Sequence, residues 1–385
     1  MKRIYIIALP FLVGTTPLQA ESLDFALGKA LFDRPWTSAP ASTQATDGLG
    51  PLFNARSCVS CHPKNGRGKI TKDKDGAIGG TGYVLRLGNA DGTGDPVYGR
   101  QLQTNAIHGQ KAEGRVFLKS HTYQLQDLAY GPMDVSTRYA GRLSQPLHGL
   151  GLLEQVSDET ILSHADPDDL DGDGISGRPN IINGQIGRFA WKATAPTLRI
   201  QAANAFFNDI GMSTPVHPQH AGDCTPSQTD CLNGPHGDSP QFENLEIDSQ
   251  MLNLMSSYLK GLRAPAYQPT EGIDLFKNVG CASCHLPDLP LPNGDVIHPF
   301  SDLLLHDMGQ ALADGIKEGD ADGQEWRTQP LWGSQETKLF LHDGRAKTVE
   351  EAINWHGGEA MKAKENFLAL PAAEKQQLIT FLNSL

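Results

Sequence analysis

Two pentapeptides carry one pattern: CVSCH at residues 58–62 and CASCH at residues 281–285. They use four of the six cysteines in a chain of 385 residues. Each pentapeptide ends a longer shared segment, since LFNARSCVSCH (52–62) aligns without gaps on LFKNVGCASCH (275–285). The chain therefore contains an internal repeat, and whatever chemistry Cys-x-x-Cys-His performs is expected to occur twice.

The pentapeptide has the spacing of a covalent attachment site for a c-type haem. Its two thiols bond to the two vinyl groups of a porphyrin, and the histidine that follows supplies an axial nitrogen to iron. A structural zinc site and a redox dithiol are the alternatives, but neither accounts for a histidine after both pairs. We predict two covalently bound haems, held by Cys58, Cys61 and His62 and by Cys281, Cys284 and His285.

The first twenty residues have the pattern of an export signal. MKR is a positive region, IYIIALPFLVG is an apolar region, and LQA before Glu21 is a small-residue cleavage site. The apolar run is too short and too interrupted for a convincing membrane span, and no later segment is apolar enough. We therefore expect residues 1–20 to be a signal peptide and the mature protein to work in the periplasm, an oxidising compartment.

Length and charge limit the possible partners. A chain of 385 residues has room for about two domains. The formal net charge of −12 argues against nucleic acid or an anionic membrane as a partner. It suits a small, basic redox protein that donates electrons, because complementary charge steers two proteins together.

The remaining cysteines, Cys224 and Cys231, lie in the segment GDCTPSQTDCLNG. Its Gly, Pro, Ser and Asp residues predict a surface loop. In an oxidising compartment we expect a disulfide that closes this loop. A reactive thiol pair is the alternative, although nothing nearby in the sequence supplies the positive charge that favours a thiolate.

Each half of the chain is predicted to end in an amphipathic helix. Apolar residues recur at helical spacing before APAYQP (264–269) and again at the C-terminus: Leu252, Met255, Leu259 and Leu262, then Leu378, Phe381, Leu382 and Leu385. A haem-bearing segment followed by a closing helix is the layout of a cytochrome c domain. We predict a mostly α fold with two cytochrome c-like domains, 21–264 and 265–385, the first carrying a long insertion, and haems near their interface.

An acidic segment, DPDDLDGDGISGRPN (166–180), follows the order of a calcium loop. The alternating oxygen ligands of such a loop are matched by Asp169, Asp171, Asp173 and the carbonyl group of Ile175. The twelfth position holds Asn180, where an EF-hand has a bidentate Glu. We predict a calcium site here; a solvated acidic loop is the alternative.

The segment KTVEEAINWHGG (347–358) predicts a helix that presents a histidine. Thr348 and Glu351 form a capping box at its start, and two glycines follow His356 at its end. His356 shares one face with Val349, Ala352 and Ile353, which are apolar. We predict that His356 is the distal ligand of the second haem. A buried structural histidine is the alternative, and His342 and His306 are competing ligands.

Several segments together resemble the di-haem oxidoreductase family: GLGPLFNARSCVSCHPKNGRG, DLDGDGISGRPN, GRFAWKA, SDLLLHDMG, WRTQPLWG and LHDGRAKTVEEAINWHGGEA. That family is similar in plan to the bacterial di-haem cytochrome c peroxidases and the methylamine-utilisation di-haem enzyme. The resemblance implies that electrons enter at the C-terminal haem and that hydrogen peroxide, or another small oxidant, reacts at the N-terminal haem. A di-haem electron carrier and a thiol oxidoreductase are the alternative functions.

The resemblance also implies catalytic roles for two residues. Trp191, in GRFAWKATAP, matches an electron relay between the haems, and an ordinary core aromatic is the alternative. Glu154, in LHGLGLLEQV, matches a distal carboxylate that moves a proton between the two peroxide oxygens. A surface glutamate is the alternative for Glu154.

This chain departs from the family's pattern at both distal positions. Related peroxidases carry Met where His356 stands, and bis-histidine ligation would lower the potential of the second haem. Ile78 occupies the place of a distal histidine near the first haem, so that ligand does not carry over. The other candidate ligands in the insertion are His108, His121 and His148.

Overall fold

The computed structural model describes residues 22–79, 82–268 and 271–385, so the predicted signal peptide, residues 1–20, lies outside the described residues. Helices make up 30% of the chain and strands 15%, which makes the fold mixed and corrects the prediction of a mostly α protein. Within the described ranges, no helix has the length and apolar character needed to cross a bilayer.

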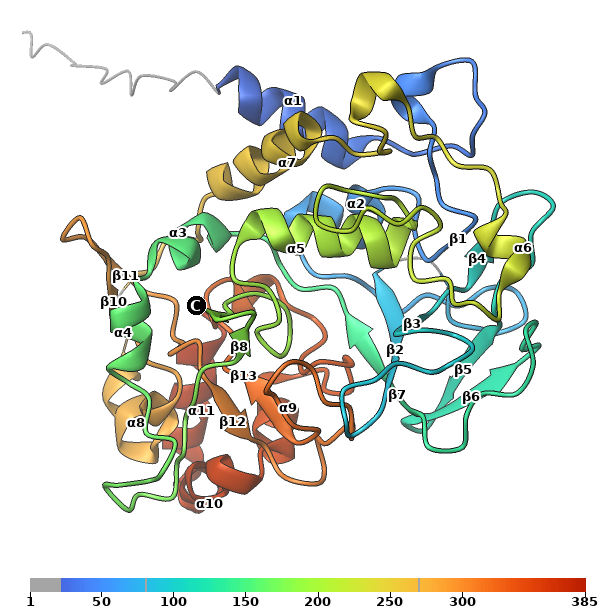
Figure 1. The fold of residues 1–385 in the computed structure, drawn as a ribbon. Helices are drawn as coiled ribbons and strands as arrows, with labels where there is room; N and C mark the ends of the chain where they lie inside the picture. The colour runs from blue at the N-terminus through green and yellow to red at the C-terminus, as the bar shows by residue number, and fades with distance from the viewer. Residues whose placement is uncertain (1–21, 80–81, 269–270) are drawn as a thin grey trace, which may run out of the picture.

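The helices are divided between the two halves of the chain, and most of the strands belong to the first half (Figure 1). The helices of the first half are α1 (Leu23–Asp33), α2 (Cys58–Cys61), α3 (Leu150–Gln155), α4 (Asp158–Leu162), α5 (Leu198–Ala205), α6 (Thr229–Leu232) and α7 (Ser249–Gly261). Those of the second half are α8 (Ile273–Val279), α9 (Val349–Trp355), α10 (Met361–Ala369) and α11 (Ala372–Leu382).

The strands are short and form small antiparallel sheets. They are β1 (Leu52–Phe53), β2 (Tyr83–Gly88), β3 (Gln101–Leu102), β4 (Asn105–Ala106), β5 (Arg115–Lys119), β6 (Thr122–Gln126), β7 (Arg138–Leu143), β8 (Ile181–Ile182) and β9 (Gln185–Ile186). The second half adds β10 (Leu289–Pro290), β11 (Val296–Ile297), β12 (Leu305–Asp307) and β13 (Glu325–Arg327).

In the first half, α1 and α5 both pack against α7 (Figure 1). Helix α7 begins where the Asp248 carboxylate accepts the backbone N–H of Met251 (2.7 Å). Gly28 lets α1 approach closely, because a Cβ at this position would lie 2.1 Å from the Leu254 carbonyl oxygen. The predicted apolar stripe of α7 is buried in this core, as its exposed fractions show: Leu252 0%, Met255 2%, Leu259 6% and Leu262 8%.

The insertion of the first half is where the strands concentrate. Strand β2 lies between β3 and β7, pairing with β7 from Tyr83↔Leu143 to Gly88↔Arg138. Its side chains alternate between buried and partly buried over most of its length, the period-2 pattern of a strand. These strands have an apolar cluster of their own, including Leu85, Leu102 and Val116. A separate β core in the insertion explains why the helical content falls below the prediction.

In the second half, α8, α9, α10 and α11 enclose a second apolar core. Phe276, Phe300 and Phe381 meet in this core with ring centroids 5.6–5.9 Å apart. The C-terminal stripe predicted from the sequence is buried in the same core. The four helices therefore enclose Phe300, which follows CASCH in the sequence.

The two halves of the chain share an apolar cluster. Residues 262–268 form neither helix nor strand, as expected of a linker. Three leucines from beyond the linker, Leu289, Leu303 and Leu304, nevertheless belong to the same apolar cluster as α5 and α7. The division into domains 21–264 and 265–385 therefore remains a prediction.

Candidate functional site

A single cavity of about 700 Å³ is lined by both CxxCH motifs, although they lie far apart in the sequence. This volume is typical of sites that bury a cofactor-sized ligand. The structure brings most of the predicted site residues to this cavity: Cys58, Cys61, His62, Trp191, Cys281, Cys284, His285 and His356. Glu154 is not among the residues that line it.

The first motif holds its histidine in a defined orientation. The Nδ1–H of His62 donates to the Gln145 carbonyl (2.8 Å), which leaves Nε2 with its lone pair. Burial lowers the pKa of His62 to about 4, so the ring is neutral at pH 7. Behind the motif, the Ser144 hydroxyl donates to the Cys61 carbonyl (2.6 Å), and Tyr258 of α7 donates to Asn65 (2.6 Å). Neutral imidazole with a free Nε2 is the form that ligates iron.

The second motif repeats this arrangement. The Nδ1–H of His285 donates to the Phe300 carbonyl (2.9 Å), and burial lowers the pKa of His285 to about 4. In each motif the backbone N–H of the histidine donates to the carbonyl of the first cysteine, at 3.0 Å for His62 and 2.9 Å for His285. The same pentapeptide therefore gives the same proximal geometry twice.

None of the four motif cysteines takes part in a disulfide within the described residues. Burial raises the pKa of Cys58, Cys61 and Cys281 to about 12 and also raises that of Cys284. They are thus protonated, and within the part of the chain that the structure describes they do not gather into one metal-binding group. A zinc site built from two CxxC pairs needs four converging thiolates, so the thiols fit covalent attachment of a porphyrin better.

His356 lies beside the second motif. The Thr348 hydroxyl oxygen accepts the N–H of Glu351 (3.1 Å), which confirms the predicted start of α9, and His356 is the residue that caps its end. The Nδ1–H of His356 donates to the Ala352 carbonyl (2.8 Å), and burial lowers its pKa. His356 lines the cavity together with His285 and is one of the groups that lower the pKa of His285. This arrangement fits two imidazoles on one iron, and the ligand role of His356 remains a prediction.

The two competing histidines differ in their chemistry. His306 has Asp302 at one ring nitrogen (2.8 Å) and Glu359 at the other (2.7 Å). Although burial opposes the charge, these hydrogen bonds raise its pKa well above the usual value, so both nitrogens carry protons. His342 lies flat on Trp326, with ring centroids 3.9 Å apart, and burial lowers its pKa. His306 therefore has no lone pair for iron, whereas His342 does.

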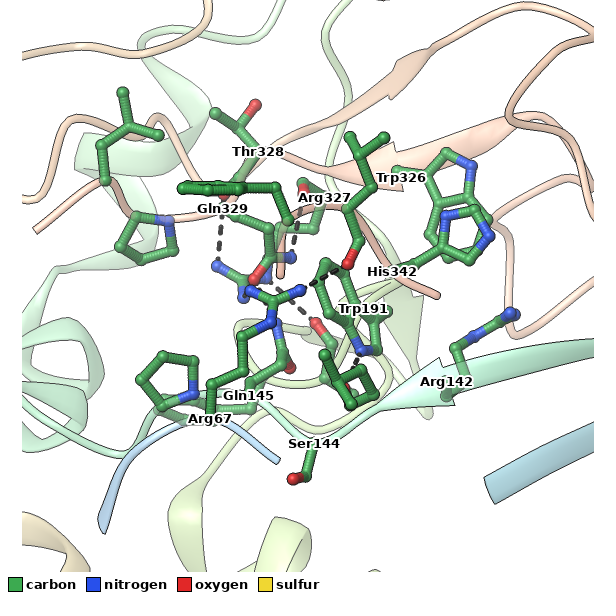
Figure 2. Close-up of a pocket in the computed structure, with 18 of the residues that line it drawn as sticks. Arg67, Arg142, Ser144, Gln145, Trp191, Trp326, Arg327, Thr328, Gln329 and His342 are labelled. Carbon is green, nitrogen blue, oxygen red and sulfur yellow. Dashed lines mark hydrogen bonds between the residues drawn. The ribbon is translucent and has the colours of Figure 1, made fainter. Parts of the chain in front are cut away.

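Trp191 lies inside the cavity wall (Figure 2). Its indole N–H donates to the Leu143 carbonyl at the end of β7 (2.8 Å). The Arg67 guanidinium lies 5.0 Å from its ring centroid, and the His342 ring lies 6.4 Å away. Trp191 thus contacts segments from both halves, a position that an electron relay requires; the relay role itself remains a prediction.

Two arginines in this wall, the partly buried Arg67 and the buried Arg327, lack a counter-ion in the described part of the chain (Figure 2). Burial lowers the pKa of both to about 10. Arg67 donates to a backbone carbonyl while its Nε is buried without a hydrogen-bond partner. A buried cation is stabilised by an anionic partner. The carboxylates of haem would supply one, so the residues present fit this cofactor.

Gln145 connects the two halves of the chain within the cavity wall (Figure 2). The Gln145 carbonyl accepts the His62 hydrogen bond, and the Gln145 side-chain amide donates to the side-chain oxygen of Gln329 in the second half. The same oxygen of Gln329 accepts a hydrogen bond from Arg327 (3.0 Å).

A family model described as "Di-haem oxidoreductase, putative peroxidase" matches residues 11–77 and 121–385. The chain belongs to this di-haem oxidoreductase family. Membership implies two haems, and the cysteines of both motifs agree with c-type attachment. The unmatched internal segment, 78–120, contains the whole of β2, β3, β4 and β5, so the family model omits much of the β insertion.

The solved structures that a structural comparison returns share little sequence with this di-haem oxidoreductase. Hydrazine synthase of Kuenenia stuttgartiensis is 13% identical, with 100% of both chains covered and a TM-score of 0.37. The diheme peroxidase BthA of Burkholderia thailandensis is 14% identical over 95% of this chain and 86% of that one (TM-score 0.39). A MauG-like protein associated with microbial copper homeostasis is 17% identical over 62% and 89% (TM-score 0.34). No curated protein matches the chain.

Both carboxylate oxygens of Glu154 in this di-haem oxidoreductase make contacts that hold helices together. One carboxylate oxygen accepts the backbone N–H of Leu198 at the start of α5 (2.7 Å), and the other pairs with Lys260 (2.8 Å). The structure therefore places Glu154 at a helix terminus and outside the cavity wall, where it does not support the predicted proton transfer.

A different carboxyl group lies in the cavity wall: Asp209. It lies on the π-helical turn η3 (Phe206–Ile210), and its side chain accepts a hydrogen bond from the Gln101 amide (2.7 Å). Burial raises the pKa of Asp209, and its charge raises the pKa of Cys58 and Cys61, which places it near the first motif. The sequence offered no periodic signal for it; only the π turn, a feature frequent at functional sites, marks it in the structure.

The acidic loop differs in detail from the predicted calcium ligand set. Carboxylate oxygens of Asp169 and Asp171 lie within 4.8 Å of one another and of Asp166, which replaces Asp173 in the cluster. Asp173 and Ile175 instead line the cavity. The amide of Asn180 is used elsewhere, since it donates to two backbone carbonyls.

The remaining predictions concern cysteines and histidines outside the motifs. Cys224 and Cys231 form the expected disulfide, and neither lines the cavity. Among the candidate distal histidines, His148 lines the cavity, whereas His108 is exposed and His121 packs against Trp355. The thiol oxidoreductase alternative thus has no free thiol pair at this loop.

Proposed function

We propose that this di-haem oxidoreductase reduces hydrogen peroxide at the haem held by CVSCH, with electrons that enter at the haem held by CASCH. The supporting observation is an asymmetry within one cavity. A second imidazole, that of His356, lies close to His285, whereas Asp209 and Gln101 lie in the wall near Cys58. Two firm imidazole ligands suit electron transfer, and a polar distal pocket suits reaction with a small oxidant.

Asp209 is the residue that we assign to proton transfer at the first site. When bound, haem supplies the iron that exchanges electrons with peroxide. The protein supplies protons, because hydrogen peroxide, two electrons and two protons give two molecules of water. Burial raises the pKa of Asp209, the direction that favours proton donation, and the hydrogen bond from Gln101 orients its carboxyl group. Positioned acid–base groups contribute ~10²–10⁴ in rate.

Trp191 is the residue that we assign to electron transfer between the two sites. Its ring is held by the hydrogen bond to Leu143 and lies against Arg67, so it is fixed in the wall that both motifs share. Arg67 and Arg327 are assigned to the haem carboxylates, since both are cations without a carboxylate partner in the described residues.

The test is a spectrum of the half-reduced protein before and after an equivalent of hydrogen peroxide. The proposal predicts a high-spin signal from one haem that disappears when peroxide is added, together with oxidation of a reduced donor. Two low-spin haems that do not react with peroxide would indicate an electron carrier. Loss of turnover in Cys224→Ser/Cys231→Ser with both haems retained would indicate a thiol oxidoreductase.

We also propose that the protein works in the periplasm and receives electrons from a small basic protein. The export pattern of residues 1–20 and the disulfide Cys224–Cys231 support the location. The net charge of −12 supports the basic partner. Turnover that stays constant as ionic strength rises would contradict an electrostatically steered donor.

Calcium at the acidic loop remains part of the proposal, with the ligands revised to Asp166, Asp169 and Asp171. Three carboxylates in one loop repel each other, and a hard divalent cation with oxygen ligands relieves that repulsion. Elemental analysis should find calcium, and chelation should lower the thermal stability. No calcium, and no change on chelation, would contradict the site.

A further inference from the structure

A second cluster of metal-ligating side chains lies outside the cavity, in the loops between η3 and α7. It consists of His220, His236, Asp238 and Glu246, none of which lines the cavity. Ligand atoms of His220, His236 and Glu246 all lie within 4.8 Å of one another. The two imidazole rings stack with centroids 4.6 Å apart and planes 18° from parallel.

Glu246 is the fixed and buried member of the cluster, with only 2% of its side chain exposed. Its carboxylate accepts the backbone N–H groups of Ser213 (2.8 Å) and Gly237 (3.2 Å). The only ion-pair partner of this carboxylate in the described part of the chain is His220, whose Nδ1 lies 3.2 Å away. No lysine or arginine therefore neutralises a carboxylate that is out of water, a state that normally requires a cation.

Asp238 supplies a second carboxylate at the other side of the rings. One of its oxygens contacts His236 Nδ1, and the other lies 3.8 Å from His220 Nε2. Within the described residues no lysine or arginine lies within ion-pair distance of Asp238 or Glu246, so the two carboxylates face the two stacked imidazole rings. A single divalent cation among the four side chains would balance the charges of both carboxylates.

We propose that His220, His236, Asp238 and Glu246 bind a divalent transition-metal ion, of which zinc is the reference. Two imidazole nitrogens and two carboxylate oxygens are a common ligand set for zinc, and calcium and magnesium prefer oxygen alone. The site has an entry path, because the side chains of His236 and His220 are 48% and 34% exposed.

The position of this metal site suggests its effect on the fold. Gly48 lies against Glu246, since a Cβ at Gly48 would lie 2.7 Å from the Glu246 Cγ, and Gly237 packs against the Gly48 backbone. The segment that leads to CVSCH passes through this contact. A bound ion would therefore hold the loops 213–246 to the segment that precedes the first motif.

The experiment uses the full di-haem protein, treated with a chelator and then dialysed into excess calcium. Zinc is added alone and measured by elemental analysis and by competition with a chromophoric chelator, with iron as the internal count of protein. We expect one zinc ion per chain and a rise of a few degrees in Tm, because the ion binds the folded state.

Two single variants and one matched control decide the assignment. His220→Ala and His236→Ala should each weaken zinc binding by roughly 100-fold or more and abolish the rise in Tm, with haem spectra unchanged. His298→Ala is the control: His298 also pairs with an aspartate, Asp288 (2.6 Å), but outside any such cluster. It should bind zinc as the unaltered protein does.

Zinc binding that is equal in all four proteins would overturn the proposal, because it would show adventitious binding only. The same holds if less than stoichiometric zinc binds to the unaltered protein at a concentration that saturates the competitor. Asp238→Asn guards against a folding artefact, since it keeps the shape of the side chain and should weaken zinc binding while the protein remains folded.

Discussion

The neighbourhoods of CVSCH and CASCH are alike on the proximal side and different beyond it. Each histidine donates its Nδ1–H to a backbone carbonyl, Gln145 or Phe300, and each has its pKa lowered by burial to about 4. Near the second motif stands another imidazole, His356, whereas near the first stands the carboxyl group of Asp209. The repeat therefore determines attachment, and residues outside the repeat determine what each haem can do.

This difference also has a structural origin. The wall near CASCH combines the compact group α8 to α11, in which α9 brings His356 to the cavity, with strand residues such as His306 of β12. The wall near CVSCH includes the β3 residue Gln101 and the π turn η3, and the described part of the second half contains no π-helical turn. The π turn, which carries Asp209, is therefore the element that distinguishes the first site.

The largest effect is expected from removal of one attachment site. Cys281→Ser with Cys284→Ser should lower the covalently retained haem from two per chain to one and abolish turnover, because no electron can enter. The pyridine haemochrome assay after acid-acetone extraction measures this directly. The control Cys224→Ser/Cys231→Ser should keep both haems and lose about 2 kcal/mol of stability, since it opens a short loop. Two haems retained in the first variant would refute covalent attachment at CASCH.

Changing His356 should remove the second imidazole ligand that is proposed for the haem at CASCH, while the haem content stays at two per chain. His356→Ala should leave one haem high-spin or water-ligated and block electron transfer into the protein. His356→Met should keep six-coordination and raise the potential of that haem, because thioether ligation favours ferrous iron. Optical and EPR spectra with a redox titration measure both. A low-spin spectrum that persists in His356→Ala would move the ligand to His342.

A matched pair of isosteric variants tests which carboxyl group serves the first site. Asp209→Asn should slow peroxide reduction by ~10²–10⁴, because it removes a proton-transferring group. Glu154→Gln should leave the rate within about twofold and lower stability by less than about 1 kcal/mol, since it weakens only a partly exposed ion pair with Lys260. Steady-state rates and urea unfolding separate the two. The opposite ranking would restore Glu154 to the proton-transfer role.

The smallest effect is expected in the contribution of His306 to the pH dependence of the free energy of unfolding. Its pKa in the folded protein lies well above the ordinary value of 6.5, so protonated His306 stabilises the fold. This contribution is complete below about pH 6.5 and is lost as pH rises through the folded-state pKa, at ~1.4 kcal/mol per unit of difference. Glu359→Gln removes one partner and should shrink the loss, as unfolding midpoints over this pH range would show. An equal loss in both proteins would assign it to another group.

The features that could be predicted from the sequence are local ones. Such features are the two attachment motifs, the capping of α9 by Thr348 and the disulfide, each of which depends on residues within about ten positions of each other. The structure contains the predicted N-cap at Thr348 and the predicted disulfide Cys224–Cys231. The strands of the insertion were missed because a search for helical periodicity does not detect an alternation such as that of β2. The prediction of a mostly α fold therefore holds only in part, because the pattern changes from period 3.6 to period 2 in the insertion.

The distal residues could not be derived in the same way, because they are brought together by tertiary packing. Asp209 meets Gln101 across more than a hundred residues and lies on a turn that breaks the helical register. Glu154 was chosen by resemblance in a loosely matched stretch, and its local pattern carried no sign of the contacts with Leu198 and Lys260. The spacing of the acidic loop predicts Asp173 as a ligand. In the structure Asp166 lies in the cluster in its place.

The link through Gln145 has a mechanical consequence. Its backbone sets the plane of the His62 ring, and its side chain is tied to Gln329, which is tied in turn to Arg327. A displacement of the second half would pull on this chain of hydrogen bonds and change the orientation of the His62 imidazole. We expect the reduction potentials of the two haems to be interdependent for this reason, so that the oxidation state on one side is sensed by ring orientation on the other.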